Sequence, residues 1–181
     1  QYKGQPVLLV GGSKTDHLFL LDDLEDHLDD IQAAGGNYVR NTMSQREGIE
    51  LKPHKLLPDG KFNMDQWNED YWQRFENMLK WTHERDIFVQ IEVWDRFDFS
   101  QTNWETSPWN PGKNVNYTYE QTGFSAEYPA HPSQDRQPFF HSIPGMPRYN
   151  EKLGLIRSYQ EKFVAKMLSY SLQYGHVLYC M

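Results

Sequence analysis

The sequence predicts an α/β fold with parallel strands, and two observations carry that prediction. Four short apolar segments, each typical of a buried strand, are separated by three longer segments with helical periodicity. Strands that alternate with helices pair in parallel through right-handed crossovers. The expected element order along the 181 residues is therefore β-α-β-α-β-α-β.

The first half of the chain supplies two strands and one helix. Residues 6–10 form a continuous apolar run, which is typical of a strand that is buried on both faces. An acidic segment follows from Asp22, with apolar residues at i, i+4 and i+7 on one helical face, and Gly35-Gly36 ends it. Residues 37–43 are the second predicted strand.

The second half repeats the pattern. A helix is expected over about 65–85, because aromatic and apolar residues lie on one stripe at helical spacing. The third strand, residues 87–94, alternates between two faces. A third helix is expected over about 152–174, where Gly175 stops it, and residues 176–181 are the fourth apolar strand.

Two connections between these elements are long. The stretch that precedes the second helix contains Pro53, Pro58 and Gly60 and is predicted to be a polar loop. The stretch of about 96–150 is far longer than an ordinary connection between a strand and a helix, and loops of such length are usually functional or mobile.

Two architectures fit this order, an open doubly wound sheet and the first half of a (β/α)8 barrel. The sequence ends on an apolar strand, which favours the barrel, because a domain rarely ends on a buried strand without a covering helix. A complete barrel takes about 250 residues. Residues 1–181 would then be its N-terminal half, with about the first four strands and three helices and an insertion at about 96–150.

Composition excludes several function classes. A net charge of −7 argues against nucleic-acid binding and against a polybasic membrane surface. No apolar run approaches the ~20 residues of a membrane span, and no signal peptide begins the sequence. Cys180 is the only cysteine, and the 7 histidines lack paired ligand spacing, so neither a metal nor another cofactor is expected.

The candidate site follows from where parallel strands end, because ligands bind at their carboxyl ends in both architectures. Arg40 lies near the end of the second strand, and alternation points it to the inner face. An unpaired guanidinium there is costly. Arg40 therefore either orients a catalytic or binding carboxylate at the strand ends or forms a structural salt bridge with Glu92 of the third strand, and the two roles are compatible.

Aromatic and polar residues near these strand ends are candidate sugar contacts. Trp94 would offer a platform for a pyranose ring, while Asp95 would bind a sugar hydroxyl or cap a turn. The chain also contains 6 Trp, 11 Tyr and 10 Phe, a large aromatic load for an acidic protein. Together with Glu92, the predicted substrate contacts are Trp94, Asp95, His17, Trp104 and Trp109.

Two local motifs have weaker implications. Residues 11–15 follow a predicted strand and resemble a phosphate-binding loop, but the first glycine of that motif is missing. Asn116-Tyr117-Thr118 fits the glycosylation sequon, a tripeptide that is common by chance.

Three segments resemble a known group, the clan A glycoside hydrolases that include the cellulase-like family five. Ala34–Arg40 matches their G-x-N-x-V-R pattern at strand two. Trp81–Ile91 resembles the passage into their third strand, with Asp86 in place of the usual glycine. Residues 176–181 are similar to their strand four. In order, the likeness runs over nearly the whole chain.

The resemblance implies a TIM-barrel enzyme that hydrolyses a polysaccharide or oligosaccharide with retention of configuration. Two glutamates at the ends of strands four and seven would be acid/base and nucleophile, about 5–5.5 Å apart. Neither is assigned to this chain; the acid/base is expected just after Met181, and the 181-residue piece alone is expected to be inactive. Arg40 matches the arginine that supports the nucleophile, whereas Trp94-Asp95 stands where these enzymes often have a substrate-binding histidine.

The same resemblance implies a carbohydrate substrate, the remaining half of the barrel as the partner of this half, and a secreted or periplasmic location. Two alternatives stay open from the residues alone. One is a barrel that binds carbohydrate without catalysis, and the other is a complete small flavodoxin-like domain that binds a small ligand.

Overall fold

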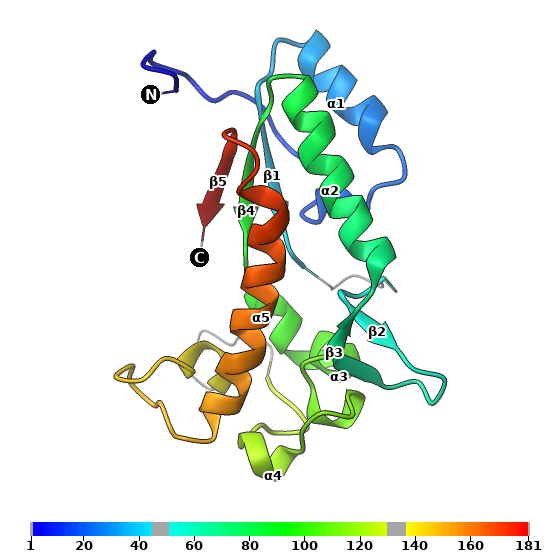
Figure 1. Ribbon diagram of the computed structural model, residues 1–181, viewed down its shortest axis with the longest axis vertical. Helices are drawn as coiled ribbons and strands as arrows, with labels where there is room; N and C mark the ends of the chain where they lie inside the picture. The colour runs from blue at the N-terminus through cyan, green and yellow to red at the C-terminus, as the bar shows by residue number, and fades with distance from the viewer. Residues whose placement is uncertain (1, 45–50, 130–136, 181) are drawn as a thin grey trace. The chain divides into compact units, whose positions relative to one another are not determined.

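The computed structural model describes residues 2–44, 51–129 and 137–180, and the chain divides into two compact units (Figure 1). Unit 1 comprises Gln1–Met43, Gln73–Trp94 and Ser169–Met181. Unit 2 comprises Ser44–Trp72 and Asp95–Leu168. Each unit is described by itself.

The elements are short 3-10 helices (η), α-helices and strands. In chain order they are η1 (Leu18–Leu20), α1 (Leu24–Ala33), β1 (Tyr38–Thr42), β2 (His54–Leu56), β3 (Phe62–Trp67), α2 (Glu69–Glu84), β4 (Phe88–Glu92), η2 (Arg96–Phe99), α3 (Gln101–Thr106), η3 (Pro111–Lys113), α4 (Tyr119–Thr122), η5 (Pro138–His141), α5 (Leu153–Ser171) and β5 (Val177–Cys180).

Unit 1 is built on a parallel sheet with the strand order β1-β4-β5 (Figure 1). Thr42 is paired with Glu92 at the carboxyl end of the β1–β4 ladder. Directly paired residues of parallel strands share a face, and alternation divides the sheet into two faces. Val39, Val89 and Ile91 are fully buried on one face, whereas Tyr38, Arg40, Phe88, Gln90 and Glu92 on the other face are partly exposed.

The first predicted strand is absent. Residues 7–10 are exposed, with Leu8 79% and Val10 53% accessible. Asn37, the residue before β1, makes the contact with this segment. Its backbone N–H donates to Val10 O at 2.7 Å, its side-chain Oδ1 accepts from Val10 N–H, and its Nδ2 donates to Leu8 O. One isolated parallel bridge, Gly11 with Tyr38, follows. A single asparagine therefore holds this segment where a strand would need a continuous ladder.

The predicted polar loop before the second helix contains a β-hairpin in unit 2. β2 and β3 pair in antiparallel fashion around a turn at Pro58-Asp59-Gly60. The turn is closed by Leu57 N–H, which donates to Lys61 O at 2.8 Å, and Gly60 adopts a φ of +80° that favours glycine.

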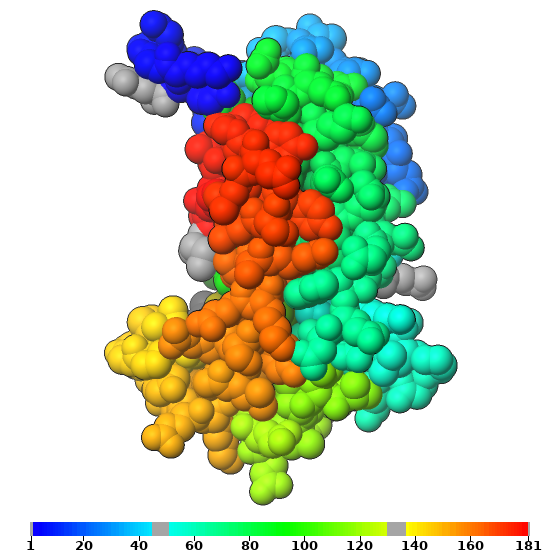
Figure 2. Space-filling view, viewed as in Figure 1, coloured from blue at the N-terminus to red at the C-terminus, as the bar shows by residue number. Residues whose placement is uncertain are grey.

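Aromatic rings fill the interior of unit 2. Phe99 stacks on Phe139 with ring centroids 3.9 Å apart, and Trp109 packs edge-on against Phe139 at 5.1 Å. Trp72 of α2 contacts Phe163 of α5 at 5.5 Å. The segment 138–149, which is yellow in Figure 2, lies at the surface. Ile143, within this segment, is 59% exposed.

These findings correct the predicted fold class. The prediction that this chain supplies the first four strands and three helices of a (β/α)8 barrel is wrong. The described residues contain five strands in a three-stranded parallel sheet and a separate two-stranded antiparallel sheet, and residues 6–10 contribute none. The physical reason is burial: barrel strands are covered on both faces, whereas Leu178, Tyr179 and Cys180 of β5 are exposed.

Within the described ranges, no helix is both long enough and apolar enough to cross a membrane.

Candidate functional site

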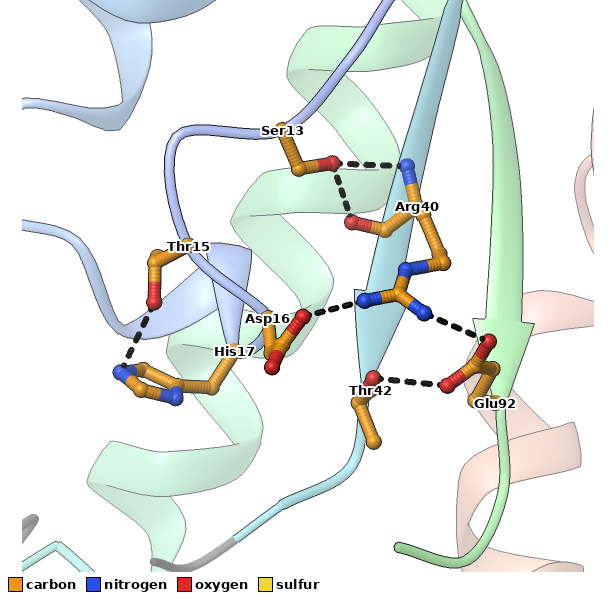
Figure 3. A network of polar contacts seen from close by, with 7 residues as sticks. All are labelled: Ser13, Thr15, Asp16, His17, Arg40, Thr42 and Glu92. Carbon is orange, nitrogen blue, oxygen red and sulfur yellow. Dashed lines mark hydrogen bonds and ion pairs between the residues drawn. The ribbon is translucent and has the colours of Figure 1, made fainter. Parts of the chain in front are cut away.

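A network of charged side chains lies at the carboxyl ends of β1 and β4 in unit 1 (Figure 3). The Arg40 guanidinium is its centre. Nη1 donates to Glu92 Oε1 at 3.1 Å, and Nη2 forms an ion pair with Asp16 Oδ1. The predicted contact between Arg40 and Glu92 is confirmed, and it follows from their positions on one face of neighbouring strands.

Hydroxyl groups and backbone bonds fix this network from both sides (Figure 3). The Thr42 hydroxyl donates to the second Glu92 oxygen at 3.0 Å. Ser13 Oγ donates to Arg40 O at 2.5 Å and accepts from Arg40 N at 2.8 Å, which attaches the N-terminal loop to β1. Thr42 N–H donates to Asp16 O at 2.6 Å, so the loop is attached again at Asp16.

The three charged side chains also reach solvent. Their accessible fractions are 42% for Arg40, 33% for Asp16 and 26% for Glu92. Desolvation opposes the charged form of Arg40, but the attraction of Glu92 and Asp16 outweighs it and raises the guanidinium pKa above its ordinary value. The arginine is therefore a fixed, permanently charged donor that a solute can approach.

Further polar groups continue along the same face of the sheet. Tyr38 and Gln90 alternate in phase with Arg40 and Glu92, and the Tyr38 hydroxyl donates to Gln90 Oε1 at 2.9 Å. The face thus combines guanidinium, carboxylate, amide and phenol groups, which suits a ligand with several hydroxyl groups.

Two of the predicted contacts belong to unit 1. His17 is half-buried in the loop that carries Asp16, and its Nε2 lies 3.2 Å from Thr15 Oγ1 (Figure 3). Trp94 is also half-buried and comes two residues after β4. Trp94 follows the end of a strand, whereas the strand expected before His17 is absent, so His17 lies in a loop that precedes η1.

The other predicted contacts belong to unit 2. Asp95 caps η2, since its carboxylate accepts from Phe97 N–H at 2.9 Å. Trp104 and Trp109 are buried, with 0% and 1% of their surface accessible. The aromatic packing described above takes up both rings, so their role as sugar contacts stays a prediction that the proposal below does not use.

Sequence reasoning missed a buried polar cluster in unit 2. Asp98 is 4% exposed and accepts a hydrogen bond from Ser44 Oγ at 3.0 Å. Lys52 is 6% exposed, and desolvation lowers its pKa although Asp98 acts in the opposite direction. Desolvation is the main reason why the pKa of Tyr71 is raised, and the charge of Asp98 raises it further. No spacing motif joins these residues, because they come from a loop, a helix and a 3-10 turn.

His54 is a second missed group. It is 1% exposed, stacks on Trp67 at 4.9 Å, and meets Trp109 edge-on at 5.9 Å. Among the described residues, neither ring nitrogen has a hydrogen-bond partner. Burial lowers its pKa to about 3, with Asp65 acting weakly in the opposite direction.

Comparison of the chain with protein-family models, with curated proteins and with solved structures finds no significant match.

Proposed function

We propose that the protein is a carbohydrate-active protein of the glycoside hydrolase type, and that the Arg40 network is part of its sugar-binding site. The observation that carries this proposal is the guanidinium held between Asp16 and Glu92 at the strand ends. Ligands of open α/β sheets bind at this edge. The segment Ala34–Arg40, which positions the guanidinium, is also the segment that resembles strand two of the clan A glycoside hydrolases.

The chemistry of the network matches that of a sugar. Each hydroxyl of a pyranose both donates and accepts hydrogen bonds, and the network offers N–H donors on Arg40 and oxygen acceptors on Asp16 and Glu92. Because two carboxylates already hold the guanidinium, little side-chain freedom is lost when a ligand binds. We therefore assign the three residues to binding and positioning.

In the proposed reaction, a glycosidic bond of a polysaccharide or oligosaccharide is hydrolysed with retention of configuration. That mechanism needs one carboxyl group as acid/base and a second as nucleophile. Asp16 and Glu92 are both engaged with Arg40, so we assign the two catalytic glutamates to other residues, as the resemblance implies. A secreted or periplasmic location, where such substrates are met, belongs to the same proposal.

Affinity electrophoresis tests the proposal. The chain is run in native gels that contain β-glucan, xylan, mannan or pectin, and we expect one of these polysaccharides to slow it. Arg40→Gln should migrate as in a gel without polysaccharide. Arg74→Gln is the matched control, because Arg74 is 40% exposed and pairs with Asp22 at 2.8 Å, away from the network. Normal migration of the unaltered chain in every gel, or equal retardation of Arg40→Gln, would overturn the proposal.

A second candidate function is carbohydrate binding without hydrolysis. It is favoured by the engagement of both network carboxylates with Arg40. On the proposal that the catalytic glutamates lie outside residues 1–181, the two candidates separate when a chain that includes those glutamates is incubated with the polysaccharide that slows it and the anomeric protons of the products are followed by NMR. Products with retained configuration support the hydrolase, whereas binding without products supports the second candidate.

A further inference from the structure

A second cluster of side chains lies in unit 1 at the amino ends of the parallel strands, where α2 ends and β5 begins. The rings of His83, Tyr174 and His176 form a triangle. Their centroids are 5.2 Å apart between the two imidazoles, 5.4 Å from His83 to Tyr174, and 5.5 Å from Tyr174 to His176. The Arg40 network, at the carboxyl ends, uses none of these residues.

The hydrogen bonds of His176 leave one ring nitrogen available. Its Nε2 lies 2.9 Å from Thr82 Oγ1, and the Thr82 hydroxyl donates to Met78 O at 2.7 Å. Because the hydroxyl proton is used on that carbonyl, the Thr82 oxygen accepts from His176 and fixes the ring proton on Nε2. Nδ1 then carries a lone pair that is buried and has no hydrogen-bond partner among the described residues. Histidines that bind metals show this arrangement.

The spacing of the two imidazoles suits a shared metal ion. Nitrogen–metal bonds of about 2.0–2.1 Å place two ring centroids roughly 4.5–5.3 Å apart for bond angles between ~90° and ~110°. The 5.2 Å between His83 and His176 lies in this range. His83 is exposed, so an ion has a path from solvent, whereas His176 is buried.

We propose that His83, His176 and Tyr174 form a binding site for a divalent transition-metal ion. The two imidazoles are the principal ligands and the tyrosine oxygen is the third, whose proton passes to solvent when the ion binds. Among the described residues no three His, Cys, Asp or Glu side chains gather around one point, and the proposed donor set is two imidazoles and one phenol. Such ligands suit Cu²⁺ most strongly, with Ni²⁺ and Zn²⁺ weaker, rather than Mg²⁺ or Ca²⁺.

The test is a titration of the untagged chain with Cu²⁺ at neutral pH, followed by calorimetry, electron paramagnetic resonance and visible absorption. We expect one equivalent per chain, nitrogen hyperfine structure from two imidazoles, and a phenolate-to-copper absorption band. His83→Gln should weaken binding at least tenfold, whereas His141→Gln, the matched control in unit 2, should leave it unchanged. Tyr174→Phe should remove the absorption band and keep the nitrogen signals, with Tyr149→Phe as its control.

Variants of Thr82 distinguish a metal site from rings that simply pack together, because Thr82 orients His176 without touching the ion. Thr82→Val should weaken Cu²⁺ binding about 10–100-fold, the usual effect of losing such a partner, and Thr82→Ser should restore it. Absence of one-equivalent binding, or equal affinity in His83→Gln and the unaltered chain, would overturn the proposal. An absorption band that persists in Tyr174→Phe would overturn the assignment of the third ligand.

Discussion

Unit 1 and unit 2 are organised by different interactions. In unit 1 the ladders of β1, β4 and β5 set the register, and the register brings Arg40 to Glu92 at 3.1 Å. In unit 2 the described α-helices between η2 and η5 are at most six residues long, and stacked rings such as Phe99 and Phe139 fill the interior. The regular backbone thus carries polar groups at defined positions, whereas the irregular segments use their aromatic residues as core.

Outside the β2–β3 hairpin, side-chain amides bond backbone carbonyls of unit 2. Asn114 Nδ2 donates to Pro108 O at 3.0 Å, and Gln137 Nε2 donates to Phe99 O at 2.8 Å. Buried carbonyls need such partners. The comparison therefore predicts that unit 2 depends on individual large and polar side chains, and that unit 1 tolerates changes at its exposed face.

The largest effect is expected at Trp104. Its ring is fully buried against Phe124 and Tyr128, each at 5.4 Å, and its Nε1 donates to Ser125 O at 3.0 Å. Trp104→Ala should lower the free energy of unfolding by about 3–5 kcal/mol, measured by urea denaturation. Trp94→Ala, which removes a half-buried ring from unit 1, is the control and should cost less than half as much. Equal losses would remove the contrast between the units.

The next effect is the acid sensitivity caused by His54. Its pKa is about 3 in the folded state and about 6.5 when unfolded, so the unfolded chain binds the extra proton as pH falls. The stabilisation is complete above pH ~6.5 and is lost progressively toward pH ~3, with about 3 kcal/mol lost at pH ~4. Urea denaturation at pH ~6.5 and at pH ~4 should show this loss of stability, and the loss between the same two pH values should be smaller in His54→Phe. The same pH dependence in both chains would contradict the assignment.

A smaller effect on stability is expected from Arg40→Gln, which removes the central side chain of the network. Arg40→Gln leaves two carboxylates without their ion pairs, but all three groups are partly exposed, so the cost should be about 1–2 kcal/mol. High salt should reduce the difference between Arg40→Gln and the unaltered chain, because ions screen partly exposed charges. A cost as large as that of Trp104→Ala would show that Arg40 acts chiefly as core, against the proposed binding role.

The smallest effect concerns a helix cap in unit 2. Thr118 Oγ1 accepts from Gln121 N–H at 3.3 Å, and the Gln121 side chain accepts from Thr118 N–H at 2.9 Å. Thr118→Val should cost about 0.5–1 kcal/mol in thermal or urea unfolding, and Thr118→Ser should keep nearly full stability. A larger loss in Thr118→Ser than in Thr118→Val would show that the methyl group rather than the cap supports α4.

Long periodic segments were predictable from the sequence. The apolar stripes of α2 and α5 and the alternation of β4 give helix and strand types correctly, with ends shifted by a few residues. The polar contact of Arg40 with Glu92 was predictable for the same reason, since alternation on neighbouring strands fixes which side chains share a face.

The rest depends on signals that periodicity does not contain. Hydrophobicity suggested a strand at residues 6–10, but in the described part of the chain this segment is joined to β1 by one isolated bridge at Gly11 and by the backbone and side-chain bonds of Asn37. The hairpin of β2 and β3 was missed although Pro58-Asp59-Gly60 is a typical turn sequence. The role of Asp16 as second partner of Arg40 depends on how a loop folds back, which no local pattern specifies.

The most direct test of the central claim is an NMR titration that follows the side-chain Nε–H signal of Arg40. Cellohexaose, xylohexaose and mannohexaose are added separately to the ¹⁵N-labelled chain. For one of them the account predicts saturable shifts of Arg40 Nε–H and of the Thr42 and Glu92 amides, while Arg74 stays unchanged. Saturable shifts confined to residues away from the network, or no saturable shift with any of the three sugars, would contradict it.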